Sequence, residues 1–229
     1  MRLWDLAGAE DDRRFSPYCW RVKMALRHKG LAAEEIPWRF TEKEAIAFSG
    51  QGQVPVLDDG GRVVVDSWDI ALHLDRAYPQ RPLMDSEGAR AHALFLRHWA
   101  PAAVHGPILR AIVLDLYARL HEKDKAYFRS SREQRFGMPL EKYGDPRAGV
   151  AALRGALDPV RPVLVQHAFL AGAAPGFADY ILFGPFQWAR AMSPLRLLEP
   201  DDPVYAWRER MLDLHGGYAR AAKGYPVWA

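Results

Sequence analysis

The spacing of apolar positions changes near residue 80 of this 229-residue chain. Before that point the apolar positions form short, partly β-branched runs. These runs predict four strands, at residues 3–6, 34–37, 54–57 and 63–65. The sequence Asp58-Asp59-Gly60-Gly61 between the last two runs is typical of a hairpin turn.

Two helices are predicted among these strands. The first begins after Ser16, carries apolar residues at helical spacing, and ends near Lys29 before Gly30. The second begins at Asp66 or Ser67 and ends at Tyr78-Pro79. The order of strands and helices predicts a thioredoxin-like α/β domain over residues 1–80.

Beyond a proline-containing linker, the pattern over residues 88–229 is helical, with few β-branched clusters. It predicts an all-α domain of about five helices. Helix breaks are expected near Pro101 and Pro107 and at residues 137–146, 172–176 and 200–203. One apolar helix is predicted to begin at Gly176, with Asp179 in a structural role at its N-terminus.

Composition narrows the class of protein. Hydrophobic residues make up 49% of the chain and charged residues 26%, which suits a folded domain with a substantial core. The net charge of +3 and the absence of like-charge runs argue against a nucleic-acid partner. No apolar run is long enough to span a membrane, and no signal-peptide core is visible. The single cysteine, Cys19, excludes an internal disulfide, so a cytoplasmic protein is expected.

The segment Ser16-Pro17 is the first candidate for chemistry. Serine is a favoured N-cap and proline a favoured first helical residue, so free N–H groups and the helix dipole gather at this point. A hydroxyl there can donate a hydrogen bond to a thiolate. Such a charge-assisted bond is worth about 1.5–3 kcal/mol, while lowering a thiol pKa by two units requires about 2.7 kcal/mol. An ordinary helix cap is the plain alternative.

Two further segments carry candidate binding residues. In Gln53-Val54-Pro55, proline belongs at the start or edge of a strand, and a cis bond would turn the Val54 backbone outward to pair with a peptide ligand. In Asp66-Ser67, the hydroxyl and the free helix N–H groups suit a carboxylate, and the aspartate suits an amino group. A strand-start proline and a simple capping pair are the alternatives.

Other motifs favour no additional chemistry. His98 and His105 would lie about 10 Å apart on a continuous helix, too far to share a metal ion, so no metal is predicted. There is no nucleotide-binding glycine loop. Several aromatic residues of the second half are expected in the core, with some facing a cleft between the domains: Trp99, Tyr117, Tyr127, Phe128, Phe183, Phe186 and Trp188.

Taken together, these segments resemble the glutathione transferase superfamily over the whole chain. The resemblance implies that Ser16 holds the glutathione sulfur and that Val54 pairs with the cysteinyl backbone. It implies that Asp66 and Ser67 hold the γ-glutamyl end, that Pro55 belongs to the glutathione-binding residues with Val54, and that Gln53 helps on the glycyl side. Arg39 and Lys43 are weaker candidates for the glycyl carboxylate. It also implies a symmetric homodimer.

Within the superfamily, the chain is most similar to bacterial β-aryl etherases and their fungal etherase-like relatives. The matching stretches are Ser16-Pro17-Tyr18 with Trp20-Arg21, Asp66-Ser67-Trp68 with Ile70-Ala71, Tyr78-Pro79 with Arg81-Pro82, Ser131-Arg132-Glu133-Gln134, and Phe177-Ala178-Asp179-Tyr180. Two departures are visible. Ser16 stands where a glutaredoxin has its first cysteine, and Gly176 stands where the family prefers Ser or Thr.

The hypothesis from the sequence is a glutathione transferase. Glutathione, as cosubstrate, would attack an apolar and aromatic electrophile, with cleavage of a β-aryl ether as a sharper form. The alternative from another class is a non-catalytic protein that keeps the fold to carry ligands or dock partners. A redox enzyme using Cys19 is a third interpretation, although a small buried residue is the plainer role for that cysteine.

Overall fold

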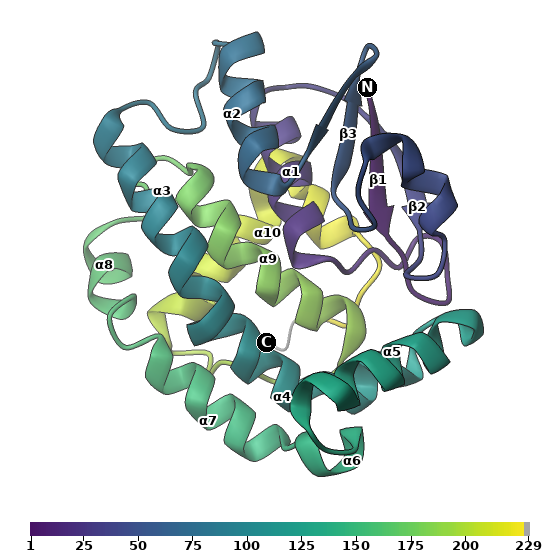
Figure 1. The fold of residues 1–229 in the computed structure, drawn as a ribbon. Coiled ribbons are helices and arrows are strands. Elements are labelled where there is room, and N and C mark those ends of the chain that lie inside the picture. The colour runs from purple at the N-terminus through teal and green to yellow at the C-terminus, as the bar shows by residue number, and fades with distance from the viewer. Residues whose placement is uncertain (227–229) are drawn as a thin grey trace.

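Four strands form one mixed sheet in the order β2-β1-β3-β4 (Figure 1). Strand β1 runs parallel to β2 and antiparallel to β3, which forms a hairpin with β4. Their bounds are Arg2–Leu6 (β1), Glu34–Trp38 (β2), Val56–Asp59 (β3) and Arg62–Val65 (β4). The structure, a computed structural model, describes residues 1–226, so the last three residues of the predicted helical range lie outside the described residues.

The helices of the first half follow the predicted caps. Helix α1 (Pro17–His28) has Ser16 at its N-cap and ends before Gly30, whose φ is +70°. Helix α2 (Ser67–Ala77) has Asp66 at its N-cap. A short 3₁₀ helix, η1 (Lys43–Ser49), occupies a segment for which the sequence predicted no element. The thioredoxin-like half is therefore confirmed.

The second half is helical as predicted, but about five helices was too low a number. Residues 87–221 form eight α-helices and one π-helical turn, η2 (Pro101–His105). The α-helices are α3 (Glu87–Ala100), α4 (Gly106–Ala118), α5 (Glu122–Phe136), α6 (Leu140–Tyr143), α7 (Pro146–Ala156), α8 (Arg161–Gln166), α9 (Phe177–Met192) and α10 (Pro203–Ala221). Helices of one or two turns, such as α6, are too short to leave a periodic signal.

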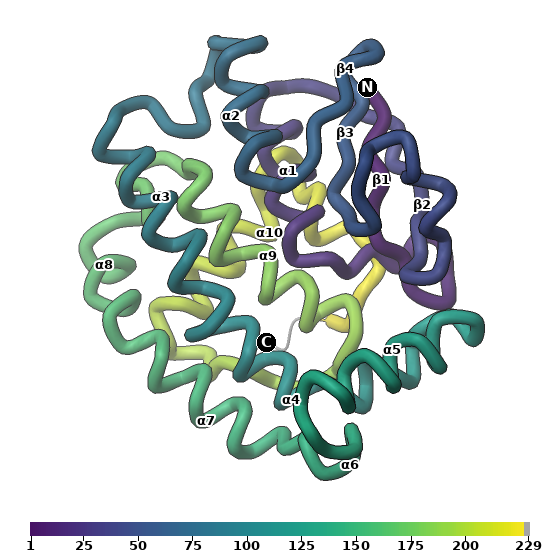
Figure 2. Tube along the Cα trace, viewed as in Figure 1, coloured from purple at the N-terminus to yellow at the C-terminus, as the bar shows by residue number. Residues whose placement is uncertain are grey.

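The predicted break at Pro101 and Pro107 is wrong. The backbone stays in the right-handed helical region at Ala100, Pro101 and Gly106, and the Gly106 N–H donates to the Pro101 carbonyl five residues earlier. This π-type turn accommodates the prolines, which have no backbone N–H and therefore cannot take part in the regular hydrogen bonding of an α-helix. Helices α3 and α4 therefore form one continuous rod that crosses the front of the view in Figure 2.

The two halves share a core. Helix α1 packs along α9, and in Figures 1 and 2 it lies between the sheet and the helical half. A second link comes from Asp124 of α5, which is fully buried and accepts hydrogen bonds from the backbone N–H groups of Phe40 and Thr41. These contacts hold α1 and the segment after β2 against the helical half. The domain bounds of 1–80 and 88–229 stay a prediction.

The predicted helix start at Gly176 is present, with Asp179 at its third position. The Asp179 carboxylate is buried and accepts from the N–H groups of Leu170, Ala171 and Gly176 and from the indole N–H of Trp207. Burial raises its pKa, and these donors oppose the rise. Every contact of Asp179 is therefore structural.

Candidate active site

Ser16 caps the helix that runs behind the candidate site. Its Oγ accepts from the Cys19 N–H at 3.1 Å, which leaves the hydroxyl proton to be donated, and the buried Cys19 thiol is the neighbouring group with which this hydroxyl interacts. The Tyr18 N–H lies in the same first turn and has no intrahelical acceptor. Ser16 is 3% exposed. A small anion at this helix end would meet one hydroxyl, one free N–H and the positive end of the helix dipole.

The strand register brings Val54 to the same edge of the sheet. Val56 pairs with Trp4 of β1, so continuing this antiparallel register by two residues brings Val54 level with Leu6. The Leu6 carbonyl accepts from the Phe15 N–H at 3.1 Å, directly before Ser16. The Val54-Pro55 bond is cis, and both residues precede β3, outside its ladder. Two segments that are far apart in the sequence therefore meet beside the start of α1.

Asp66 and Ser67 lie at the same end of the β3–β4 hairpin, because Val65 pairs with Val56. Asp66 adopts a positive φ of 67° and accepts from the Trp68 N–H at 2.8 Å. Its carboxylate also pairs with the Arg97 guanidinium of α3 at 3.3 Å. Ser67 is 3% exposed, and its hydroxyl has no partner within residues 1–226. The pair thus leaves a free hydroxyl and a partly exposed carboxylate for a ligand.

The three candidates for the glycyl side differ in whether other residues of the protein already engage their side chains. Gln53 is exposed and adjoins Val54. Lys43 donates to the Gly52 carbonyl and stacks on Trp38, and burial lowers its pKa. Arg39 is occupied by the Gly8 carbonyl and by Asp11, on the far side of β1 from β3. Arg39 is therefore the least suited of the three to meet a glycyl carboxylate.

Cys19 is fully buried in the first turn of α1. Burial, together with the nearby Asp5 carboxylate, raises the pKa of this thiol well above its ordinary value. A protonated and enclosed thiol is a poor nucleophile. These features agree with the interpretation of Cys19 as a small packing residue.

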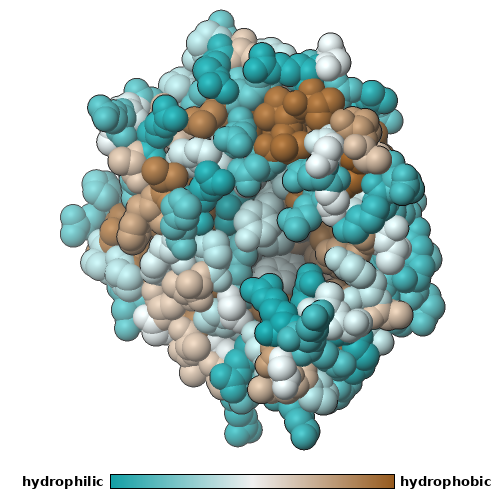
Figure 3. Space-filling view, viewed as in Figure 1, coloured by the Kyte–Doolittle hydropathy of each residue, from teal (hydrophilic) through white to brown (hydrophobic). Residues whose placement is uncertain are grey.

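The aromatic residues of the helical half divide between core and cleft. Phe183 and Phe186 pack on Trp207, and Phe128 packs on Phe40, so these rings belong to the core. Trp188 is also buried, and its ring lies 6.2 Å from that of His105 in η2. In the space-filling view the surface is hollowed where the strands face α3 and α4 (Figure 3).

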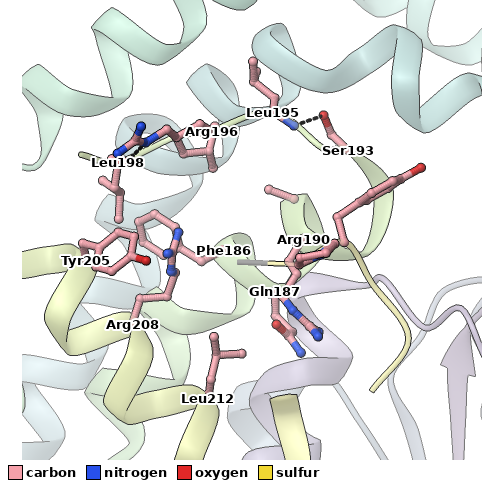
Figure 4. Close-up of a pocket in the computed structure, with 14 residues that line it drawn as sticks. Phe186, Gln187, Arg190, Ser193, Leu195, Arg196, Leu198, Tyr205, Arg208 and Leu212 are labelled. Carbon is pink, nitrogen blue, oxygen red and sulfur yellow. Dashed lines mark hydrogen bonds between the residues drawn. The ribbon is translucent and has the colours of Figure 1, made fainter. Parts of the chain in front are cut away.

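A separate pocket lies between α9 and α10 (Figure 4). Phe186, Arg190, Arg208 and Tyr225 are among its lining residues, and none of the residues from Ser16 to Ser67 lines it. Its volume of about 30 Å³ holds only a water molecule or two. This pocket is therefore distinct from the site at the start of α1.

Comparison with known families agrees with this arrangement. The profile of the glutathione S-transferase N-terminal domain matches residues 12–82, and that of the glutathione S-transferase C-terminal domain matches residues 91–199. The chain belongs to the glutathione S-transferase superfamily. The two matched ranges contain the capped start of α1, the Val54-Pro55 turn, the Asp66-Ser67 corner and the Gly176–Asp179 helix start.

Individual relatives of this glutathione S-transferase family member are distant. The glutathione S-transferase-like protein ustS of Aspergillus flavus is 30% identical over 69% of this chain and 58% of its own length. Glutathione transferase omega-1 of Caenorhabditis elegans is 25% identical over 76% of this chain and 60% of its own length. The chain therefore spans less than two thirds of the length of these curated relatives.

Solved structures share the fold over nearly the whole chain. Glutathione transferase GSTFuA3 of Phanerochaete chrysosporium superposes with a TM-score of 0.76 at 26% identity, covering 95% of this chain and 92% of that one. A glutathione S-transferase of Ceriporiopsis subvermispora, solved in complex with glutathione, superposes with a TM-score of 0.79 at 22% identity, covering 95% and 96%.

The structure of this glutathione S-transferase family member adds residues that the sequence did not single out as a site. Arg97 reaches Asp66 from α3, and Arg21 and His105 meet beside Tyr18. Arg97 is one of many scattered arginines, so only the fold reveals its partner. Within residues 1–226, no three His, Cys, Asp or Glu side chains are close enough to form a metal site, and no helix is long and apolar enough to cross a membrane.

Proposed function

We propose that this protein is a glutathione transferase in which Ser16 activates the glutathione thiol. The supporting observation is the Ser16 hydroxyl, which caps the N-terminus of α1 through its oxygen and keeps a proton to donate, beside Val54 and the Asp66-Ser67 corner. Val54 would pair with the cysteinyl backbone as a short added strand, with Gln53 near the glycyl end. Ser67 would donate to the γ-glutamyl carboxylate, and Asp66 would accept from its amino group.

The chemistry follows from the thiolate. Loss of the thiol proton to solvent leaves an anion that accepts from the Ser16 hydroxyl and from the free N–H of the first turn. The sulfur then attacks an electrophilic carbon, an S–C bond forms, and the leaving group departs with its electron pair. In the sharper form of the proposal, the substrate is a β-aryl ether and the leaving group is a phenolate.

The homodimer expected for the superfamily is part of this proposal. Apolar side chains on α3 and β4 are exposed, with Leu94 at 40%, Phe95 at 62% and Val63 at 40%. Figure 3 shows an apolar patch over the β3–β4 hairpin. Exposed apolar groups of this kind suit burial against a second copy. A cytoplasmic location is likewise proposed from the single, buried cysteine.

The deciding experiment replaces Ser16 with alanine. Turnover with aryl halides and aryl ethers should fall about 10- to 100-fold, because the lost bond stabilises the thiolate more than the thiol. Glutathione binding should change little, and Cys19→Ser serves as the matched control with unchanged turnover. Turnover that is unchanged in the Ser16 variant would remove Ser16 from the mechanism.

Thermal stability separates catalysis from a scaffold role. Glutathione far above its Kd should raise the Tm of both the wild type and the Ser16 variant, because a ligand that binds only the folded state stabilises it. If the wild type shows neither a shift nor turnover, the protein is a non-catalytic member of the fold and the proposal fails.

A further inference from the structure

Arg21 is a buried cation without a carboxylate partner. It lies on α1 and is 2% exposed. The other buried cations of this segment are paired, Lys23 with Asp5 at 3.0 Å and Lys29 with Asp75 at 2.5 Å. Burial lowers the pKa of Arg21 to about 10, so the guanidinium stays charged at neutral pH. A buried charge is normally paired, and this one calls for a ligand.

Among residues 1–226 no carboxylate forms an ion pair with Arg21; Asp66 acts on it only through its field and pairs with Arg97 instead. Its Nη2 contacts Nε2 of His105 at 3.3 Å, and its Nε has no acceptor within residues 1–226. Burial and the Arg21 charge lower the pKa of His105 to about 3, so the imidazole is neutral and its Nε2 accepts. The remaining imidazole proton then sits on Nδ1, which has no partner among the described residues.

Trp188 contributes a second unpaired donor. Its indole Nε1 is buried and has no acceptor within residues 1–226, and its ring lies 6.2 Å from that of His105. Tyr18, which is 38% exposed, covers the Arg21 guanidinium at 4.6 Å and faces His105 at 5.3 Å. We refer to these four residues as the Arg21 cluster: Tyr18, Arg21, His105 and Trp188.

The Arg21 cluster adjoins the proposed thiol site. A long side chain on a helix points back toward the helix N-terminus, and the Arg21 guanidinium accordingly lies over Tyr18, two residues after Ser16. It also lies within the field of the Asp66 carboxylate. Buried donors without acceptors are rare in folded proteins. A group that carries negative charge and only accepts hydrogen bonds would satisfy the unpaired donors of Arg21 and Trp188.

We propose that the Arg21 cluster binds a carboxylate carried by an aromatic acceptor substrate. This inference rests on the proposed transferase function and adds the charge of its second substrate. The carboxylate would accept from Arg21 and from the Trp188 indole, and the Tyr18 ring would stack on the aryl group. The electrophilic carbon would then lie on the Ser16 side of the aryl ring.

The test compares two conjugates that differ only in the para substituent of the benzyl group, a carboxylate in one and an uncharged methyl group in the other. S-(4-carboxybenzyl)glutathione and S-(4-methylbenzyl)glutathione are titrated calorimetrically against the full-length protein. The wild type should bind the carboxylate conjugate about 10- to 100-fold more tightly, as expected for a buried charged hydrogen bond. Arg21→Met should abolish this preference and leave the affinities for the methyl conjugate and for free glutathione unchanged.

Two further variants separate loss of the carboxylate site from a general effect of substitution on folding. Trp188→Phe retains the ring and removes only the indole N–H, so it should lower the carboxylate preference about 3- to 10-fold. Arg27→Met, on the same helix but paired with Glu35 at 4.0 Å, should leave the preference intact.

The outcomes are distinguishable. Equal affinity of the wild type for the two conjugates, with normal binding of glutathione, would overturn the carboxylate site and leave the transferase proposal standing. Failure of glutathione and both conjugates to bind would overturn the proposed function itself. If Arg21→Met dissociates an oligomer and keeps the conjugate preference, the partner of Arg21 is an acidic group of a second copy, and the carboxylate site is wrong.

Discussion

Gly184 of α9 lies directly against the Pro17 carbonyl at the start of α1. A Cβ added at Gly184 would fall 2.2 Å from this backbone oxygen, far inside any normal contact distance. The oxygen belongs to the Pro17–Tyr18 peptide, one residue after Ser16. The absence of one side chain in the helical half thus sets how closely the proposed catalytic hydroxyl approaches that half.

Gly184→Ala is therefore expected to damage both stability and the site. Alanine is a better helix former than glycine, but overpacking against rigid backbone costs about 1–3 kcal/mol and outweighs that gain. The free energy of unfolding in urea should fall, and the pKa of bound glutathione, followed by thiolate absorbance, should rise because the α1 N-terminus is displaced. Gly155→Ala, in α7 with no atom within 4 Å of the added Cβ, should be neutral or slightly stabilising. Equal behaviour of the two variants would contradict the steric argument.

Lys23 and Arg21 should respond differently to the same substitution. Lys23→Met removes the partner of Glu35 at 2.8 Å and leaves the fully buried Asp5 carboxylate with only the more distant Arg14, at 3.7 Å. The free energy of unfolding should therefore fall by about 3 kcal/mol. Arg21→Met removes a charge that has no carboxylate partner and leaves no orphaned acid. Its unfolding free energy should stay the same or rise. Chemical denaturation at pH 7 measures both, and a large loss in the Arg21 variant would mean that its charge is paired in solution.

The buried imidazole of His105 predicts a loss of stability in acid. Its pKa is lowered by burial from the ordinary 6.5 to about 3, so between these values the unfolded chain binds a proton that the folded chain refuses. The free energy of unfolding is therefore unaffected by the titration of His105 above pH 6.5, and it decreases as the pH falls from 6.5 toward 3. His105→Gln should flatten the decline of unfolding free energy between pH 6.5 and 4, measured by urea titration.

His92→Gln is the control for this measurement, because His92 is exposed on α3. It should leave the pH dependence unchanged. Burial also lowers the pKa of His28, and that of His215 to about 4, so part of the decline should survive in the His105 variant. An identical decline in the wild type and the His105 variant would contradict the prediction.

Asp66→Asn separates recognition of the γ-glutamyl amino group from helix capping. Asparagine can keep the cap to the Trp68 N–H and tolerates the positive φ of 67° at this position, so stability should change little. The Kd for glutathione should rise about 10-fold with the loss of a charge-assisted bond. The Kd for N-acetylglutathione, which lacks the amino charge, should not change. Equal weakening of both ligands in calorimetry would assign Asp66 a different role.

Local signals in the sequence determined much of the architecture. Ser16 with Pro17 and the stop at Gly30 mark the ends of α1, and the Asp58–Gly61 turn marks the β3–β4 hairpin, because caps and turns depend on residues close together in the chain. The sequence predicted a helix break at Pro101, but α3 continues into α4 through a π-turn at this point. Local preference alone, which disfavours proline inside a helix, therefore gave the wrong prediction.

Gly176, which stands where the family prefers Ser or Thr, also shows the difference between local preference and tertiary packing. From the sequence, glycine is a weaker cap than Ser or Thr. In the fold, a Cβ at Gly176 would lie 2.8 Å from the Ala171 Cβ and 3.2 Å from the Leu83 carbonyl oxygen. The residue is therefore dictated by a close approach between segments that are distant in the chain, which no local pattern records.

The sequence by itself determined the strands, the two capped helices, the family resemblance and the residue types for holding a thiol. Only the tertiary structure decided which side chains lie near the proposed thiol site: Arg97 against Asp66, and Arg21, which has no carboxylate partner, beside His105 and Trp188. The physical reason is range. Capping and periodicity act over a few residues, whereas burial and charge pairing depend on contacts between segments that are distant in the chain. The residues in contact are 31 positions apart for Asp66 with Arg97 and 84 for Arg21 with His105.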